Sequence, residues 1–138
     1  MTPEQLALIH DRAFTRQRAW SAAEFRELLA QASIRLLHRG QAFLLLRLLP
    51  PEMEILTLAV APAARRQGLA LALLDDTEML ARDQGVNRLF LEVAACNAPA
   101  VGLYVRAGFA KTGLRPAYYT HKDGTRDDAL IMERVLTA

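Results

Sequence analysis

The sequence contains a single cysteine, Cys96, in 138 residues. One cysteine cannot form a disulfide within the chain, which excludes a small disulfide-stabilised fold. The three histidines, His10, His38 and His121, do not stand at zinc-site spacing with the cysteine or with one another. We therefore expect no bound metal and expect these histidines to be structural or exposed. A lone cysteine is most often a small buried apolar residue, so we expect no nucleophilic role for Cys96.

Long apolar runs and clustered basic charge are also missing. Stretches such as 43–49 fall short of the roughly 18 apolar residues of a membrane helix, and the start has no basic region typical of a secretory signal. The 17 basic residues are interspersed with 15 acidic ones along the chain, and only Lys111 and Lys122 are lysines. Because a surface that binds nucleic-acid phosphates needs clustered basic residues, we expect no direct nucleic-acid binding. The short apolar runs and the missing signal lead us to expect no membrane association and a cytoplasmic location.

What the sequence does have is enough apolar residues, 52%, for one folded domain over 1–138. Capping patterns at 2–5 and 21–24 predict two helices, and three apolar runs at 33–38, 41–49 and 53–60 predict antiparallel strands. The rest of the chain predicts a helix, a strand, a short helix and two strands joined by a hairpin turn, at 68–84, 88–93, 99–107, 118–121 and 129–135. We expect an α/β (α+β) domain whose mixed, mostly antiparallel sheet is flanked by helices.

The turn between the third strand and the long helix is the first candidate site. It carries an Arg65-x-x-Gly68-x-Ala70 spacing. Free amide groups at a helix start suit a pyrophosphate, and small residues let the backbone approach it closely. The spacing is neither the Walker nor the Rossmann pattern. By itself it is equally consistent with a surface turn before a helix that packs on the sheet.

Further motifs follow this turn in a fixed order. They are Leu58-Ala59-Val60 before Pro62, Leu91-Glu92-Val93 with Asn97 five residues after Glu92, Leu103-Tyr104, Gly108-Phe109, Tyr118-Tyr119 and Asp128-Ala129-x-x-Met132. In these motifs the sequence resembles the GNAT family of N-acetyltransferases. It is most similar to the bacterial members that acetylate the N-terminal alanine of a ribosomal protein.

This resemblance implies acetyl-CoA as the co-substrate. Backbone groups of Leu58, Ala59 and Val60 would pair with its pantetheine arm, and Asn97 would bond the arm near its reacting end. The pyrophosphate would lie against the turn and helix start, at Arg66, Gln67, Gly68, Leu69, Ala70 and Leu71, with Arg66 adding charge. Direct acetyl transfer of this kind requires no metal.

The resemblance also assigns Glu92 as general base and Tyr104 as general acid. The acceptor amine must lose a proton before it attacks a thioester, and the departing thiolate must gain one. A peptide α-amino group, with a pKa near 7.7–8.0, is easier to deprotonate than a lysine near 10.4. The expected acceptor is therefore a peptide or protein N-terminus, with Glu92 acting directly or through water. The alternatives are that Glu92 forms a structural ion pair and that Tyr104 is helix core.

Several other expectations remain open on the sequence alone. Trp20 and the Tyr118-Tyr119 pair belong either to the core or sheet packing or to the acceptor groove. The sequence enters a helix at Pro3 where family members usually have a strand, so we expect the first strand to be missing and strand 33–38 to lie at a sheet edge. An open edge invites a second chain, which predicts a monomer or a weak homodimer. Acetylation of a small amine or a lysine, or a catalytically idle acyl-CoA-binding module, are the alternative functions.

Overall fold

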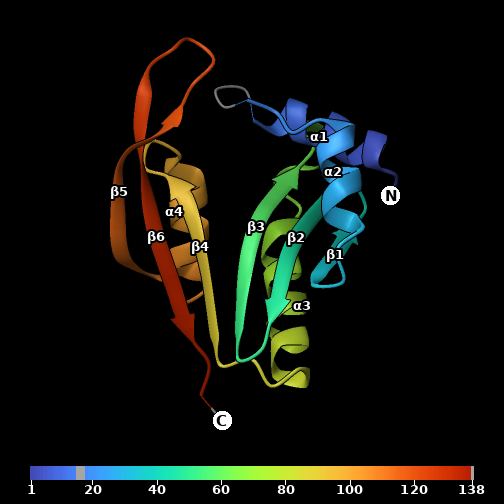
Figure 1. Cartoon of the computed structure of the whole chain (residues 1–138), viewed down its shortest axis with the longest axis vertical. Helices are drawn as coiled ribbons and strands as arrows, with labels where there is room; N and C mark the ends of the chain where they lie inside the picture. The colour runs from blue at the N-terminus through green and yellow to red at the C-terminus, as the bar shows by residue number, and fades with distance from the viewer. Residues whose placement is uncertain (15–17, 138) are drawn as a thin grey trace.

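The computed structural model describes residues 1–14 and 18–137. These residues form a six-stranded sheet flanked by four helices, as predicted (Figure 1). In chain order the elements are α1 (Pro3–Ala13), α2 (Ala22–Leu29), β1 (Ile34–Arg39), β2 (Ala42–Leu49), β3 (Glu52–Val60), the 3₁₀ turn η1 (Pro62–Ala64), α3 (Leu69–Asp83), β4 (Arg88–Ala94), α4 (Ala98–Arg106), β5 (Ala110–Thr120) and β6 (Arg126–Val135).

The sheet is split between its two central strands. Its strand order is β1-β2-β3-β4-β6-β5, and β3 and β4 form its parallel pair. Their pairing covers only 52–55 of β3 and 88–91 of β4, and beyond it the strands diverge as a V (Figure 1). At the closed end Arg88 forms ion pairs with Glu52 and Glu133, which join β3, β4 and β6. The open end exposes part of the β3 backbone edge to the space between the strands.

A β-bulge in β3 lies where the strands begin to diverge. Thr57 pairs with Leu45 of β2 and Ile55 pairs with Leu46, so Leu56 is the extra residue. A bulge increases local twist and reverses the alternation of side chains along the strand. Before it, Ile55 packs toward α3 and α4, and after it Leu58 packs toward the same face. The bulge thereby turns β3 away from β4.

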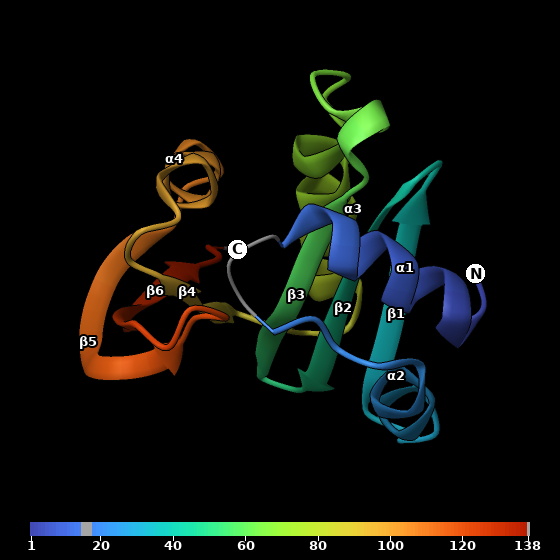
Figure 2. The same ribbon diagram turned by 90° about the horizontal axis from the view of Figure 1, so that it is seen from above.

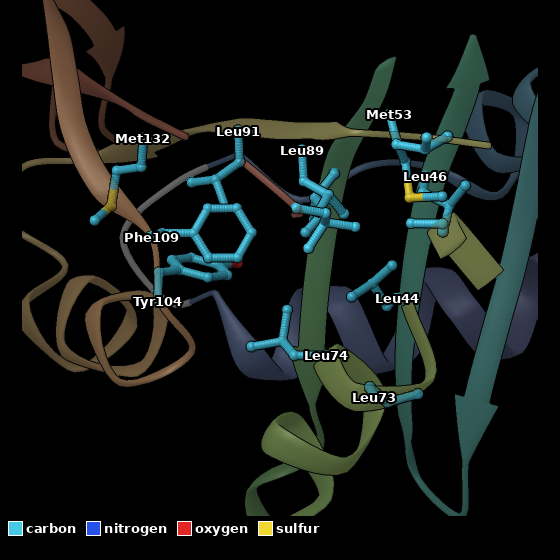
Figure 3. Packing of buried hydrophobic residues seen from close by; sticks show 14 of the residues in the cluster. Leu44, Leu46, Met53, Leu73, Leu74, Leu89, Leu91, Tyr104, Phe109 and Met132 are labelled. Atoms are coloured by element: carbon cyan, nitrogen blue, oxygen red, sulfur yellow. The ribbon is translucent and has the colours of Figure 1, made fainter. Parts of the chain in front are cut away.

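The helices cover the sheet in two layers (Figure 2). The larger hydrophobic cluster lies under α3 and α4, and the smaller one lies under α1 and α2. In the larger cluster Leu73 and Leu74 of α3 pack near Leu44 of β2, and Tyr104 of α4 packs with Phe109 beside β4 (Figure 3). Because α3 covers one half of the split sheet and α4 the other, the gap between the strands also separates these helices.

The helix boundaries confirm the capping predictions. Thr2 and Gln5 form a reciprocal capping box at α1, and Ser21 and Glu24 form another at α2. At the end of α4, Gly108 adopts a φ of 94° and Phe109 N–H donates to the carbonyl of Tyr104 over 2.9 Å. This is the predicted glycine-terminated helix end.

The strand predictions need one correction. The sequence predicted a strand only over 118–121, whereas β5 begins at Ala110. Its first half is exposed and lacks the apolar alternation that identifies a strand in sequence. The predicted hairpin turn is present, with a φ of 87° at Gly124.

The strand β1 lies at the sheet edge, as predicted, and pairs with β2 alone. Pairing of this edge with a second chain stays a prediction. Over the part of the chain that the structure describes, no helix combines the length and apolar character needed to cross a bilayer.

Candidate active site

The open end of the V holds a continuous set of pockets. A groove of about 830 Å³ runs between β3, the start of α3 and α4. A cavity of about 140 Å³ continues it between β3 and β4. A second groove of about 380 Å³ opens on the side of Trp20 and the β5–β6 hairpin. The cavity therefore connects two grooves that lie on different sides of the split sheet.

The larger groove collects the predicted acetyl-CoA residues. Its lining includes all of them except Gln67, namely Leu58, Ala59, Val60, Arg66, Gly68, Leu69, Ala70, Leu71 and Asn97. Gln67 lies in the same turn between Arg66 and Gly68. Arg65, the first residue of the spacing noted in the sequence, also lines this groove, and the structure adds Arg106, which the sequence did not single out. Among the described lining residues there are thus three arginines and no carboxylate, which gives this groove the charge that a phosphate ligand requires.

The turn before α3 has the backbone form of an anion site. Arg66 and Gly68 both have positive φ angles, of 64° and 73°. Gly68 is the N-cap of α3 and offers no side chain to accept from the first amides of the helix. The first N–H groups of a helix lack intrahelical partners and carry partial positive charge, so this helix start is suited to a phosphate.

Asn97 links the groove to the loop between β4 and α4. It is the N-cap of α4, and its Oδ1 accepts from the backbone N–H of Ala100 over 3.3 Å. It lines both the larger groove and the connecting cavity. The carboxamide nitrogen is the remaining donor group of this side chain.

Glu92 and Tyr104 meet at the connecting cavity from different layers. Both line it, Glu92 from β4 and Tyr104 from α4. Tyr104 is nearly fully buried against Phe109 in the larger hydrophobic cluster (Figure 3). Burial raises the pKa of Tyr104 above its ordinary value, because the phenolate would lose its hydration there. The hydroxyl therefore stays protonated at neutral pH.

Glu92 is one of several charged residues that line the second groove. Its carboxylate pairs with Arg115 of β5 over 3.1 Å. Glu54 of β3 lines the same groove and pairs with Arg47 over 3.6 Å. Burial raises the pKa of Glu54 above its ordinary value, Arg47 opposes this, and the nearby charge of Glu92 raises it further. Sequence reasoning missed Glu54 and Arg115, because only the strand pairing brings them beside Glu92.

Aromatic side chains complete the second groove. Tyr118 and Tyr119 contact each other edge to face at 5.3 Å, and both line the groove with Trp20. Burial raises the pKa of Tyr119 to about 12, which keeps its hydroxyl protonated. Trp20 packs on His10 at a ring distance of 5.0 Å and also lines the connecting cavity and the second groove, so it belongs to both the core and the groove.

His10 holds the segment that carries Trp20. Its ring is buried between Phe14, Trp20 and Phe25, and its Nδ1 accepts from the Trp20 backbone N–H over 3.2 Å. Burial lowers the pKa of His10 to about 4. His10 is thus a neutral structural residue that also lines the connecting cavity.

Cys96 differs from expectation. The sequence predicted a buried apolar residue, but Cys96 is exposed in the loop after β4. Its Sγ lies 3.6 Å from Nε2 of His121, a residue that is buried at the end of β5. The two residues are far apart in sequence, so spacing alone could not reveal the contact.

Comparisons with known proteins show which family the sequence is similar to. The model of the acetyltransferase (GNAT) family matches residues 3–109. The [ribosomal protein bS18]-alanine N-acetyltransferase of Escherichia coli is 41% identical over 91 residues, which are 66% of this chain and 61% of that enzyme. The match thus spans less than two thirds of the relative's length. Streptothricin acetyltransferase of Streptomyces lavendulae is 38% identical over 80 residues, 58% of this chain and 42% of that enzyme.

The fold comparison extends over nearly the whole chain. The crystal structure of the ribosomal-protein alanine N-acetyltransferase from Escherichia coli superposes with a TM-score of 0.86 at 32% identity, covering 99% of this chain and 89% of that one. The split sheet, the groove at the start of α3 and the family match lead to one assignment. The chain belongs to the GNAT family of acetyltransferases.

Proposed function

We propose that this protein transfers the acetyl group of acetyl-CoA to the N-terminal α-amine of a protein, with the alanine of ribosomal protein bS18 as its acceptor. The observation that carries the proposal is the connecting cavity, in which Glu92 and Tyr104 lie between a basic groove and an acidic one. The acceptor follows from the activity that the similar Escherichia coli enzyme is named for.

An unpaired strand edge and positive charge in the larger groove support acetyl-CoA as its ligand. The unpaired edge of β3 at Leu58 to Val60 would hydrogen-bond the pantetheine amides as an added strand does. The amides at the start of α3 would hold the pyrophosphate, and Arg65, Arg66 and Arg106 supply positive charge around it. The Asn97 carboxamide nitrogen would donate to the arm near the cavity.

Glu92 and Tyr104 have the proton-transfer roles in this mechanism. Bound acetyl-CoA supplies a thioester whose carbonyl carbon accepts the amine. Glu92 takes a proton from the acceptor ammonium, directly or through one water, so that the amine lone pair is free. Tyr104 donates its hydroxyl proton to the departing thiolate as the carbon–sulfur bond breaks, and the second proton that the attacking nitrogen loses returns through water to the Tyr104 oxygen.

The high pKa of Tyr104 does not prevent this donation. A thiol has an ordinary pKa near 8.5 and a phenol near 10, so the transfer looks unfavourable in water. The burial that raises the pKa of Tyr104 acts on a thiolate in the same cavity too, since both are anions that lose hydration. The proton therefore moves as the carbon–sulfur bond breaks, so that no free thiolate forms in the cavity.

The charges of the second groove favour a cationic acceptor. Glu54 and Glu92 both line it, and Arg115 is the one arginine among its described lining residues. A peptide N-terminus enters as an ammonium, and the two carboxylates attract it. With an ordinary pKa near 7.7–8.0, the α-amine then loses its proton more easily than a lysine does.

A small-molecule amine is the second candidate acceptor. Its support is the 38% identity to streptothricin acetyltransferase over 80 residues. A catalytically idle acyl-CoA-binding module is less well supported, because Glu92 and Tyr104 both line the cavity.

Thiol release from acetyl-CoA distinguishes these functions. The purified protein is incubated with acetyl-CoA and, in separate reactions, a peptide with the bS18 N-terminus, the same peptide already acetylated at its N-terminus, and streptothricin. We expect rapid release with the free peptide only. Faster release with streptothricin would overturn the peptide acceptor, and no release with any acceptor would favour the idle module.

A further inference from the structure

Three potential metal ligands gather at the edge of the acceptor side. They are Cys96 in the β4–α4 loop, His121 after β5 and Asp127 in β6, and one ligand atom from each lies within 4.8 Å of the others. The Cys96 Sγ is 3.6 Å from His121 Nε2, which is 3.8 Å from Asp127 Oδ2. The trio is outside the proposed proton-transfer pair and has no role in the acetyl transfer derived above.

These separations are close to those around one tetrahedral ion. Zinc binds cysteine sulfur at about 2.3 Å and histidine nitrogen or carboxylate oxygen at about 2.0–2.2 Å. At a tetrahedral angle, such bonds put sulfur about 3.5 Å from nitrogen and nitrogen about 3.4 Å from oxygen. The observed distances of 3.6 and 3.8 Å exceed these by a few tenths of an ångström. Small side-chain rotations would close the difference.

The ring of His121 is oriented for this role. The side chain is only 3% exposed, and Nε2 is the ring atom that faces the cysteine and the carboxylate. Its Nδ1 is buried and has no hydrogen-bond partner among the described residues. The polar contacts that the ring makes are therefore those of Nε2. The backbone of His121 is fixed as well, because it exchanges hydrogen bonds with the turn at Gly124 and Thr125.

The carboxylate is also held in place. Asp127 Oδ2 accepts from the Cys96 backbone N–H over 2.9 Å, and Oδ1 accepts from Asp128 N–H over 2.9 Å. A carboxylate oxygen has two lone pairs, so Oδ2 can bind a cation while it keeps its backbone hydrogen bond. The same hydrogen bond positions the Cys96 loop against β6.

We propose that Cys96, His121 and Asp127 bind one zinc ion and leave its fourth coordination position open to solvent. A sulfur, nitrogen and oxygen donor set with tetrahedral separations suits zinc, whereas Mg²⁺ and Ca²⁺ prefer oxygen ligands alone. Binding converts the Cys96 thiol to a thiolate and releases its proton to solvent. The sequence did not predict this site because the ligands are 25 and 6 residues apart, and come from a loop, a strand end and the next strand.

The ion joins two segments that border the acetyl-transfer site. Tyr118 and Tyr119 on the β5–β6 hairpin line the acceptor groove, and Asn97 follows Cys96 in the loop that borders the larger groove. Zinc therefore cross-links the acceptor side to the cofactor side. The proposal does not depend on the acceptor or on the transfer activity, since it concerns metal binding alone.

Metal binding by the full-length protein tests the proposal. Chelator-treated protein is titrated with zinc in competition with a chromophoric chelator, and separately with Co²⁺ as an absorbing probe. We expect one zinc per chain and a Co²⁺ spectrum with tetrahedral d–d bands and a thiolate charge-transfer band. Cys96→Ser and Asp127→Asn weaken zinc binding by at least about tenfold. His38→Gln, which alters a histidine outside the trio, keeps the wild-type affinity.

Thermal melting with and without zinc controls for folding. At one fixed zinc concentration, zinc raises the Tm of the wild type and of His38→Gln more than that of Cys96→Ser, whose altered side chain is exposed and therefore tolerated. Three results would each overturn the proposal: no zinc-induced rise in the wild-type Tm, a Co²⁺ spectrum without the thiolate band, or unchanged affinity in Asp127→Asn.

Discussion

Glu92 forms an ion pair with Arg115 and also lines the connecting cavity. The ion pair contributes to folding stability, whereas a role at the cavity contributes to turnover. The Arg115 side chain is 53% exposed, and exposed ion pairs contribute about 0–1 kcal/mol to stability. A purely structural Glu92 would therefore have a small effect on folding and none on turnover. A general base would have a large effect on turnover, so the two roles are separable by mutation.

We expect replacement of either proposed proton-transfer residue to lower turnover without unfolding the protein. General acid–base groups contribute about 10²–10⁴-fold, so Glu92→Gln and Tyr104→Phe each reduce kcat with the alanine peptide by at least about 10²-fold. Both substitutions keep the shape of the side chain. Steady-state kinetics and urea unfolding measure the two effects.

Glu4→Gln is the matched control for these variants. It also removes an ion-paired carboxylate, the partner of Arg26, but on α1 and outside the grooves. Its turnover is expected to equal that of the wild type. Activity within about twofold of wild type in Glu92→Gln or in Tyr104→Phe would refute the role of that residue.

Glu54 contributes charge to the acceptor groove. It lines that groove with Glu92, so Glu54→Gln halves the carboxylates that attract an incoming ammonium. We expect KM for the peptide to rise by up to about fivefold, the equivalent of about 1 kcal/mol, with little change in kcat. The measurement is a full Michaelis–Menten comparison. A large fall in kcat at unchanged KM would instead make Glu54 the base.

The turn into α3 is the element that we propose holds the pyrophosphate of acetyl-CoA. Gly68 has a φ of 73°, and a side chain in this left-handed conformation costs about 1–2 kcal/mol. A Cβ built at Gly68 has no neighbour within 4 Å, so strain rather than collision is the cost. We expect Gly68→Ala to destabilise the fold by about 1 kcal/mol and to weaken acetyl-CoA binding, measured by calorimetry.

Gly102 in α4 provides the control for that substitution. It is an exposed helical glycine with no neighbour within 4 Å of an added Cβ, and it has no positive φ. Gly102→Ala should stabilise the helix by about 0.5–1 kcal/mol and leave acetyl-CoA affinity unchanged. Equal affinities in Gly68→Ala and Gly102→Ala would argue against a turn-bound pyrophosphate.

The position of Trp20 beside α1 depends on a neutral His10. Burial lowers the pKa of His10 to about 4, from about 6.5 in the unfolded chain. The unfolded state therefore binds a proton first as pH falls, and stability is lost from about pH 6.5 downward. We expect the free energy of unfolding to fall by about 2 kcal/mol more between pH 7 and pH 5 in the wild type than in His10→Gln. The measurement is urea unfolding of both proteins at both pH values. An equal fall in the free energy of unfolding in the wild type and in His10→Gln would contradict this expectation.

Local signals predicted most of the elements. The capping boxes at Thr2 and Ser21 and the glycine at 108 act within four residues, so their sequence patterns identify them. The first half of β5 was missed because its exposed residues lack alternation, and it is a strand only because it pairs with β6.

At the scale of the whole molecule, the split sheet separates charge. The groove under α3 and α4 is lined by Arg65, Arg66 and Arg106, while Glu54 and Glu92 line the groove on the other side. Motifs in the sequence pointed to Arg65, Arg66 and Glu92. They did not reveal Arg106 or Glu54, because only the divergence of β3 from β4 determines which groove each of these residues borders.

The reaction that we propose for this split site is acetylation of a protein α-amine. The direct measurement is a competition, in one reaction with limiting enzyme, between the bS18 alanine peptide and an N-terminally blocked peptide with an internal lysine, with products mapped by mass spectrometry. The easier deprotonation of the α-amine and the paired carboxylates predict acetylation at the alanine α-amine well above that at the lysine. Equal or greater transfer to the lysine would show that the α-amine is not the preferred acceptor.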